Sequence, residues 1–207
     1  MQKQTLRQTL RRDLQNIADL VEENSHILEI GCGDGDLLAY LFSEKKIDGR
    51  GIELSHSGVS KCVKNGLSVI QGDVDIDLKY YPNDCFDYTI SSQVIQATHN
   101  PKDVIMQMLR IGKKAIISIP NFGYWYNRYY LLIKGRMPVS KTLCYQWYDT
   151  PNIHFSTLKD FESLCLDLGY KIEKKILLNP AGKVSKSLFT LAFPNLFSEK
   201  CVYVIGK

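Results

Sequence analysis

The chain has 207 residues, 44% hydrophobic and 23% charged, which is typical of a folded domain with one core. A net charge of +4 is too small to indicate a nucleic-acid-binding protein, and no apolar run approaches the roughly 18 residues of a membrane span. Residues 1–25 lack the apolar core of a signal peptide, and the six cysteines form no CxxC pair. We therefore expect a cytoplasmic protein with reduced thiols and no metal site.

Apolar residues at helical spacing predict an amphipathic helix over residues 5–23, within an N-terminal segment 1–24. From there to residue 120, short buried strands alternate with helices. The predicted strands are 26–30, 50–54, 67–71, 86–92 and 114–120. The predicted helices are 36–45, 57–66 and 101–112, with Gly66 ending the second and Pro101 in the first turn of the third.

The remaining part of the chain predicts a helix over 157–169 and strands over 170–178 and 200–207. Strands that are apolar at consecutive positions and alternate with helices are typical of a parallel sheet covered on both faces. Repeats, low-complexity segments and domain linkers are absent from the sequence. It therefore predicts a single doubly wound α/β domain over residues 1–207.

Three closely spaced glycines, Gly31, Gly33 and Gly35, follow the first predicted strand. Glycine lets a ligand approach the backbone, and ligands of such sheets bind beyond the carboxyl ends of the strands. The spacing is G-x-G-x-G rather than the dinucleotide pattern G-x-G-x-x-G, and Asp34 and Asp36 would repel a pyrophosphate. A cationic ligand without phosphate fits better, although a purely structural strand-to-helix turn remains an alternative.

Acidic residues also follow the next two predicted strands. Glu53 lies 22 residues after Gly31, where a carboxylate can accept hydrogen bonds from both hydroxyls of a ribose. Asp73 follows the third strand, where it can accept a hydrogen bond from an exocyclic amine such as that of adenine. Each acid alone could be a solvated strand-end residue. Together with the glycine loop, they predict a nucleoside site.

Four stretches together resemble the class I S-adenosylmethionine-dependent methyltransferase family: "LEIGCGDG", "GIELS", "QGDVD" and "FDYTISSQVIQ". The resemblance covers nearly the whole chain. It implies a Rossmann-like seven-stranded sheet whose last strand, Cys201–Ile205, is antiparallel. It also implies S-adenosylmethionine or S-adenosylhomocysteine as the ligand.

The residues that this resemblance implies for ligand binding are Glu29, Gly31, Gly33, Glu53, Leu54, Asp73, Val74 and Ser91. In chain order, the first three border the methionine moiety, and the next two contact the ribose and the adenine. The side chain of Asp73 and the backbone N–H of Val74 read the edge of the adenine. Ser91, followed by Ser92 and Gln93, lies under the position of methyl transfer.

A catalytic base is not evident from the sequence. Family members that methylate amines carry an acidic residue or Asn before Pro-Pro and an aromatic residue, whereas this chain has "SSQVIQ". His99 and His154 could act as bases, but both also fit ordinary loop positions. Whether the protein is an enzyme therefore stays open, and a methyltransferase acting on a small molecule is one alternative.

Aromatic and basic residues are mixed in the segment 121–155. Positions 122, 126, 129 and 133 form a helical stripe that we expect in the core, whereas Tyr124 and Trp125 point elsewhere. The segment could stack nucleic-acid bases, form a lid over a small-molecule substrate, or dock a protein partner. The mild net charge argues against the first interpretation, and the residues alone leave the other two open.

A narrower resemblance comes from "SSQVIQA", "IPNFG", "GRMPV", "YQWYDTPNIH" and "DFESLC", which are similar to the methionine biosynthesis family MetW. Members typically have His-Trp where this chain has Tyr124 and Trp125. The resemblance implies an accessory protein needed for full activity of homoserine O-acyltransferase. It favours segment 121–155 as a docking surface, with contact residues Tyr124, Trp125, Arg128, Arg136 and Trp147. S-adenosylmethionine bound nearby could then report the output of the pathway.

Overall fold

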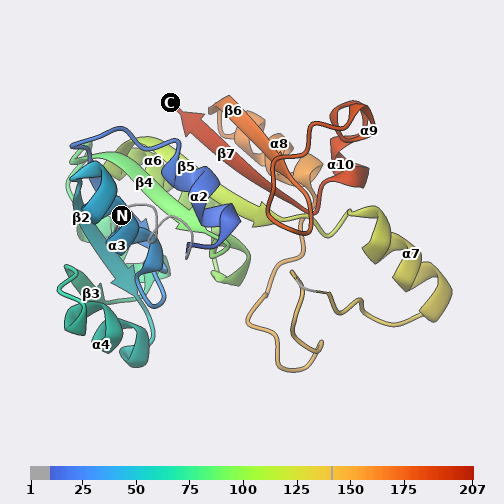
Figure 1. Ribbon diagram of the computed structural model, residues 1–207, viewed down its shortest axis with the longest axis horizontal. Helices are drawn as coiled ribbons and strands as arrows, with labels where there is room; N and C mark the ends of the chain where they lie inside the picture. Colours follow the sequence, from blue (N-terminus) through green and yellow to red (C-terminus); the bar gives the residue numbers. More distant parts are fainter. Residues whose placement is uncertain (1–9, 141) are drawn as a thin grey trace, which may run out of the picture.

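The structure, a computed structural model, describes residues 10–140 and 142–207. Seven strands form one mixed sheet in the order β3-β2-β1-β4-β5-β7-β6 (Figure 1). Their bounds are β1 His26–Ile30, β2 Asp48–Glu53, β3 Val69–Gln71, β4 Phe86–Ser92, β5 Gly112–Pro120, β6 Lys171–Leu178 and β7 Lys200–Gly206. The last strand runs antiparallel to both of its neighbours, which confirms the predicted fold class.

Helices connect the strands on both faces of the sheet. The longer ones are α2 Arg12–Ala18, α3 Asp36–Lys45, α4 His56–Lys64, α6 Pro101–Ile111, α7 Trp125–Lys134 and α8 Leu158–Asp167. The one-turn elements are α5 Val74–Asp77, η1 Leu78–Tyr80, η2 Ile95–Ala97, α9 Leu188–Ala192 and α10 Pro194–Phe197. Four predicted helices, α3, α4, α6 and α8, are confirmed to within two residues at each end. The one-turn elements were not predicted.

The N-terminal helix differs from its prediction. Residues 5–9 of that prediction lie outside the described residues. The continuation of the helix to residue 23 is wrong, because α2 ends at Ala18 and the chain tightens into i→i+3 bonds at Leu20 and Val21. This turn places Val21, which is 2% exposed, in the core.

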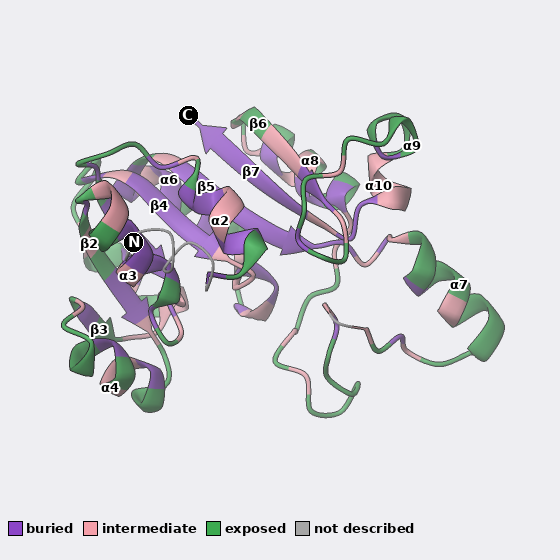
Figure 2. Cartoon of the chain, viewed as in Figure 1, coloured by how far each residue is buried: buried purple, intermediate pink, exposed green. Residues whose placement is uncertain are grey.

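The core consists of two apolar layers, one on each face of the sheet. One layer packs Leu28 and Ile30 of β1 against α6 and α8. The other packs Ile27 of the same strand against α2 and α3. Because successive side chains of a strand point to opposite faces, the continuous apolar run of β1 supplies both layers. Figure 2 shows the resulting band of buried strands between the helices.

Residues 121–155, which we call the arm, extend away from the sheet and are largely exposed (Figures 1 and 2). The arm contains α7, whose one buried residue is Asn127. The prediction that the stripe 122, 126, 129 and 133 lies in the core is wrong, since Tyr126, Tyr129 and Ile133 are 36%, 57% and 58% exposed. Helical spacing aligns these residues on one face, but α7 leaves the sheet, and that face stays largely uncovered.

Within the described part of the chain, none of the helices is long and apolar enough to cross a membrane.

Candidate functional site

The parallel strands β1, β2, β3 and β4 end at the same edge of the sheet, where a hollow of about 260 Å³ lies. Register pairs Ile30 with Ile52 and with Ser91, and Glu53 with Gln71, so the following loops meet there. The hollow is lined by five of the eight residues predicted to bind a nucleoside ligand, namely Gly31, Glu53, Leu54, Asp73 and Val74. Its opposite side is formed by the segment 93–99 after β4.

The glycine loop is built from backbone conformations that side chains rarely adopt. Gly31 has φ +63°, and a Cβ there would lie 2.4 Å from a methyl group of Val94, so the position requires glycine. Gly33 has φ +56°, and a Cβ there would enter open space. Gly33 is not among the residues that line the hollow, and its N–H is donated to Glu53, so its predicted contact with a ligand stays a prediction.

Glu53 is held by backbone donors on both sides. Its Oε2 accepts a hydrogen bond from the N–H of Gly33 at 2.9 Å, and its Oε1 accepts one from Ser55 at 2.8 Å. The carboxylate therefore fixes the glycine loop as well as facing the hollow. Each carboxylate oxygen offers a second lone pair, so both remain able to accept a hydrogen bond from a hydroxyl.

Asp73 has a structural role in addition to its place at the hollow. It is the N-cap of α5, and its Oδ1 accepts the N–H of Asp75 at 2.9 Å. Its Oδ2 accepts no hydrogen bond from a described residue and remains available. Asp75 in turn accepts the N–H groups of His99 and Asn100 at 2.8 Å, which ties the two sides of the hollow together.

Glu29 lies beneath the glycine loop rather than at the surface of the hollow. It is 3% exposed, and its Oε2 has no hydrogen-bond partner among the described residues. Burial and the Asp36 carboxylate raise the pKa of Glu29 from an ordinary 4.5 to about 8. The N–H of Leu38 lowers this pKa and Glu53 raises it further. Glu29 is therefore mostly protonated near neutral pH, and it lies two residues before the first glycine of the loop.

Ser91 is fully buried and does not line the hollow, and its Oγ lacks a partner among the described residues. Gln93 does line the hollow. Gln93 has φ +59°, and its Nε2 donates a hydrogen bond to Asp13 Oδ2 at 3.0 Å. Asp13, which is 6% exposed on α2, therefore supports one wall of the site. A lone aspartate in an amphipathic helix gave no sequence signal for this contact.

The two histidines considered as bases lie in different places. His99 lines the hollow. His154 is exposed on the arm, and its N–H donates to the carbonyl of Gln96 at 3.0 Å. Within the described ranges 10–140 and 142–207, no cluster of three or more His, Cys, Asp or Glu residues could hold a metal ion.

The arm is fastened to the sheet by buried amides. Asn121, at the end of β5, donates from Nδ2 to the carbonyls of Asn195 and Ser198 at 3.0 and 2.7 Å. Its Oδ1 accepts the N–H of Gly123 at 3.0 Å. Asn127 donates to the carbonyl of Asn121 at 3.3 Å. The root of the arm is therefore fixed, although most of its length is exposed.

A hollow of about 710 Å³ lies on the arm itself, and two predicted contact residues, Arg136 and Trp147, line it. Trp147 is 73% exposed. The rings of Tyr124 and Trp125 meet edge to face with centroids 5.8 Å apart. Arg128 is exposed, and its Nε donates to the carbonyl of Gly123 at 2.5 Å. The arm therefore offers an open apolar and basic surface.

The returning end of the arm is hydrogen-bonded to the segment that lines the strand-end hollow. Ile153 and His154 donate their N–H groups to the carbonyl of Gln96 at 2.9 and 3.0 Å. Gln96 in turn donates from Nε2 to the carbonyl of Gln93 at 2.7 Å. Since Gln93 lines the hollow, a short chain of hydrogen bonds connects the two surfaces.

Comparison with known proteins gives one family match and one curated relative. The model of the family "Methionine biosynthesis protein MetW" matches residues 11–205. A protein of Rhodopirellula baltica, "Bifunctional methionine biosynthesis protein MetXA/MetW", is 31% identical over 177 residues. The match covers 81% of this chain but 28% of the relative, so the chain spans a little over a quarter of that protein.

Solved structures share the fold at low sequence identity. An S-adenosylmethionine-dependent methyltransferase of Archaeoglobus fulgidus is 17% identical with a TM-score of 0.70, covering 97% of this chain and 94% of that one. Another from Mesorhizobium loti is 16% identical with a TM-score of 0.67, covering 94% and 95%. The sheet is therefore that of the class I methyltransferases.

Proposed function

Because the chain belongs to the MetW family of methionine biosynthesis proteins, we propose that it is an S-adenosylmethionine-binding accessory protein that supports homoserine O-acyltransferase. The hollow at the strand ends holds the nucleoside, and the arm docks the enzyme. The single observation that carries the proposal is the chain of hydrogen bonds through Gln96 that connects the arm to the hollow at the strand ends. The Rhodopirellula relative, whose name joins MetXA and MetW on one chain, favours a physical association with a second component of methionine biosynthesis.

The residues at the strand ends fit S-adenosylmethionine or S-adenosylhomocysteine. Glu53 would accept the ribose hydroxyls, and the available Oδ2 of Asp73 would accept the adenine amine. The backbone at Gly33 would meet the methionine moiety, with the unpartnered acid Glu29 beneath it. An ammonium group and a sulfonium suit this acidic setting, since opposite charges favour the ionised carboxylate. When bound, S-adenosylmethionine supplies an electrophilic methyl group.

The exposed surface of the arm supports a protein partner. Tryptophan, tyrosine and arginine dominate interface hot spots, and a partner side chain could enter the 710 Å³ hollow beside Arg136 and Trp147. An exposed apolar surface of this kind marks an interaction site in soluble proteins. The surrounding basic residues, Lys134 among them, favour an acidic face on the acyltransferase.

Joint purification with a homoserine O-acyltransferase tests the proposal. We expect a stable complex and a higher acyltransferase rate than for the enzyme alone. Trp147→Ala should weaken the complex at least about tenfold, roughly 1.4 kcal/mol, because a hot-spot side chain is removed. Phe42→Ala is the matched control, since Phe42 is 64% exposed on α3, away from the arm. Equal loss for both variants, or loss for neither, would contradict docking through the arm.

Regulation by the ligand is a separate part of this proposal. The hydrogen bonds from Gln93 through Gln96 to residues 153 and 154 give a route by which the nucleoside could shift the arm. Affinity for the acyltransferase should change about fivefold or more at saturating S-adenosylmethionine, within the usual range of such coupling. Unchanged affinity and rate would rule out sensing and leave docking intact.

Methyl transfer to a small molecule is the second candidate function, and the location of His99 at the hollow favours it. His99 could accept a proton from a nucleophile that enters beside the ligand. Incubation with S-adenosylmethionine and a broad metabolite extract should then release S-adenosylhomocysteine. His99→Ala should abolish that release. If the unaltered protein releases no S-adenosylhomocysteine with the extract, this result would count against an enzyme.

A further inference from the structure

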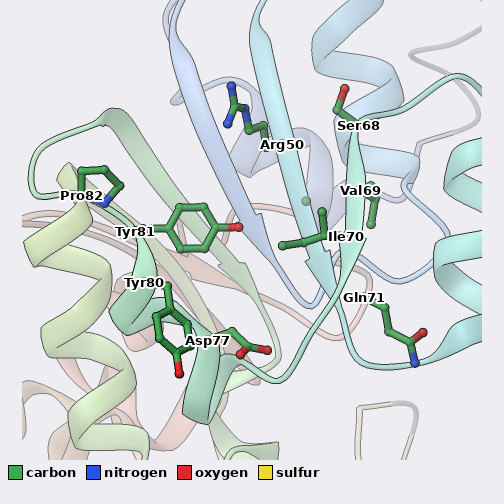
Figure 3. Close-up of a pocket in the computed structure, with 10 residues that line it drawn as sticks. Arg50, Ser68, Val69, Ile70, Gln71, Asp77, Tyr80, Tyr81 and Pro82 are labelled. Carbon is green, nitrogen blue, oxygen red and sulfur yellow. The ribbon is translucent and has the colours of Figure 1, made fainter.

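A larger hollow, of about 770 Å³, lies on the outer strands β2 and β3, beside the strand-end hollow (Figure 3). It is open because the chain after β3 forms only the single turns α5 and η1. Register pairs Ile52 with Ile70, yet Ile52 is completely buried and Ile70 is 52% exposed. The residues that cover Ile52 on this face of the sheet therefore do not extend over Ile70 on the neighbouring strand. The volume falls within the range of about 300–1,000 Å³ typical of small-molecule sites.

One side of this hollow carries an unpaired cation. Arg50 of β2 is exposed and makes no hydrogen bond or ion pair with any residue in the described ranges. Asp48, two residues earlier on β2, is paired with His26 at 3.2 Å. The guanidinium is therefore free to bind a planar anionic group through two parallel hydrogen bonds.

The other side is aromatic and apolar. Figure 3 shows the ring of Tyr81 projecting into the hollow towards Ile70, with Tyr80 beside it. Tyr80 is 73% exposed, and Lys79 Nζ lies 5.0 Å from the centre of its ring. Burial raises the pKa of Tyr81, and the charge of the Arg50 guanidinium lowers it. These surfaces suit a flat ring.

The one carboxylate that lines this hollow is already engaged. Asp77 Oδ2 accepts the N–H of Asp73 at 2.8 Å. Gln71, also at the hollow, donates to the carbonyl of Leu54 at 3.3 Å. Both contacts reach residues that line the strand-end hollow, so the two hollows are neighbours, although no described residue lines both. Ligands could therefore occupy both at once.

We propose that this hollow is a second small-molecule site, for a flat aromatic anion that carries a carboxylate, sulfonate or phosphate group. The anionic group binds Arg50, with the hydroxyl of Ser68 on the same side. The ring packs on Tyr80, Tyr81 and Ile70. This site is independent of the nucleoside site and of the docking surface on the arm.

Methyl NMR spectroscopy with 2-naphthalenesulfonate as the probe tests this proposal. The methyl signal of Ile70 should shift and saturate, whereas that of Ile133 on the arm, which is equally exposed, should not. Neutral 2-naphthalenesulfonamide has the same ring and should bind at least about tenfold more weakly, because it lacks the charge for the guanidinium. Since this comparison uses the unaltered protein, it does not depend on any variant folding.

Arg50→Met should also weaken binding of the sulfonate about tenfold, and Arg12→Met, at an exposed arginine on α2, should leave it unchanged. Saturating S-adenosylhomocysteine should not displace the probe. Equal binding of the sulfonate and the sulfonamide, shifts at Ile133 without Ile70, or displacement by S-adenosylhomocysteine would each overturn the proposal. None of these results bears on whether the arm binds the acyltransferase.

Discussion

Two glutamates near the glycine loop differ because their surroundings differ. Glu53 accepts two backbone N–H groups, whereas Glu29 is buried and has an oxygen without a partner among the described residues. The spacing of the acids after the strands predicted that Glu53 and Asp73 would lie at the same edge of the sheet, and both line the strand-end hollow. The burial of Glu29 was not predictable, since it depends on how closely α3 covers the strand.

Glu29 should make the protein less stable as pH rises. Its folded pKa of about 8 exceeds the ordinary 4.5, so the folded state holds a proton that the unfolded state releases between these values. The free energy of unfolding should fall across this window by up to about 1.4 kcal/mol per pH unit. Glu29→Gln should remove that slope. Urea unfolding from pH 5 to 8.5 gives the free energy of unfolding of the unaltered protein and of Glu29→Gln. The same dependence on pH in both proteins would contradict the raised pKa of Glu29.

Replacing Glu53 tests whether its carboxylate is needed for ligand binding. Glu53→Ala should weaken S-adenosylhomocysteine binding about a hundredfold, because charged hydrogen bonds of about 1.5–3 kcal/mol each are lost. Isothermal titration calorimetry gives the affinity. Glu23→Ala, at an exposed acid before β1, is the control and should bind like the unaltered protein. A change of less than threefold for Glu53→Ala would mean that Glu53 does not hold the ribose.

The arm is an element held at its ends rather than by a packed face. Asn121 makes side-chain hydrogen bonds to Asn195, Ser198 and Gly123, so Asn121→Ala leaves buried carbonyl and N–H groups unpaired. We expect a loss of about 1–3 kcal/mol in the free energy of unfolding. We also expect faster proteolysis within 122–155, because the root of the arm loosens.

Asn65→Ala is the control for that experiment, because Asn65 is exposed at the end of α4. Cleavage sites and rates can be followed by mass spectrometry. If both variants are cut at the same rate within the arm, the buried amide does not anchor it.

Elements with a regular alternation of strand and helix were predicted to within about two residues, and the irregular ones were not. In β1 and β4 the predicted and observed bounds agree, and both strands are buried over most of their length. In α7 the periodicity identified a common face but could not reveal what covers it. α9 and α10 are too short to show a period, and Phe189 and Phe193 remain 70% and 60% exposed.

The molecule as a whole should be stabilised by the proposed nucleoside ligand. A ligand at 100 times its dissociation constant adds about 2.7 kcal/mol to the free energy of unfolding. For a chain of 207 residues this corresponds to a rise in Tm of roughly 5–10 °C. Differential scanning fluorimetry with S-adenosylhomocysteine measures it. If the Tm does not rise with S-adenosylhomocysteine up to millimolar concentration, ligand binding would no longer be part of the proposed function.

The position of β7 between β5 and β6 has a consequence for biosynthesis. Strands β5 and β6 are both made earlier, yet each pairs with β7 and not with the other. While the ribosome is still translating the C-terminal strand, the nascent chain carries two open edges whose N–H and C=O groups are unsatisfied. Such edges invite association between neighbouring chains on a polysome until β7 pairs with both strands.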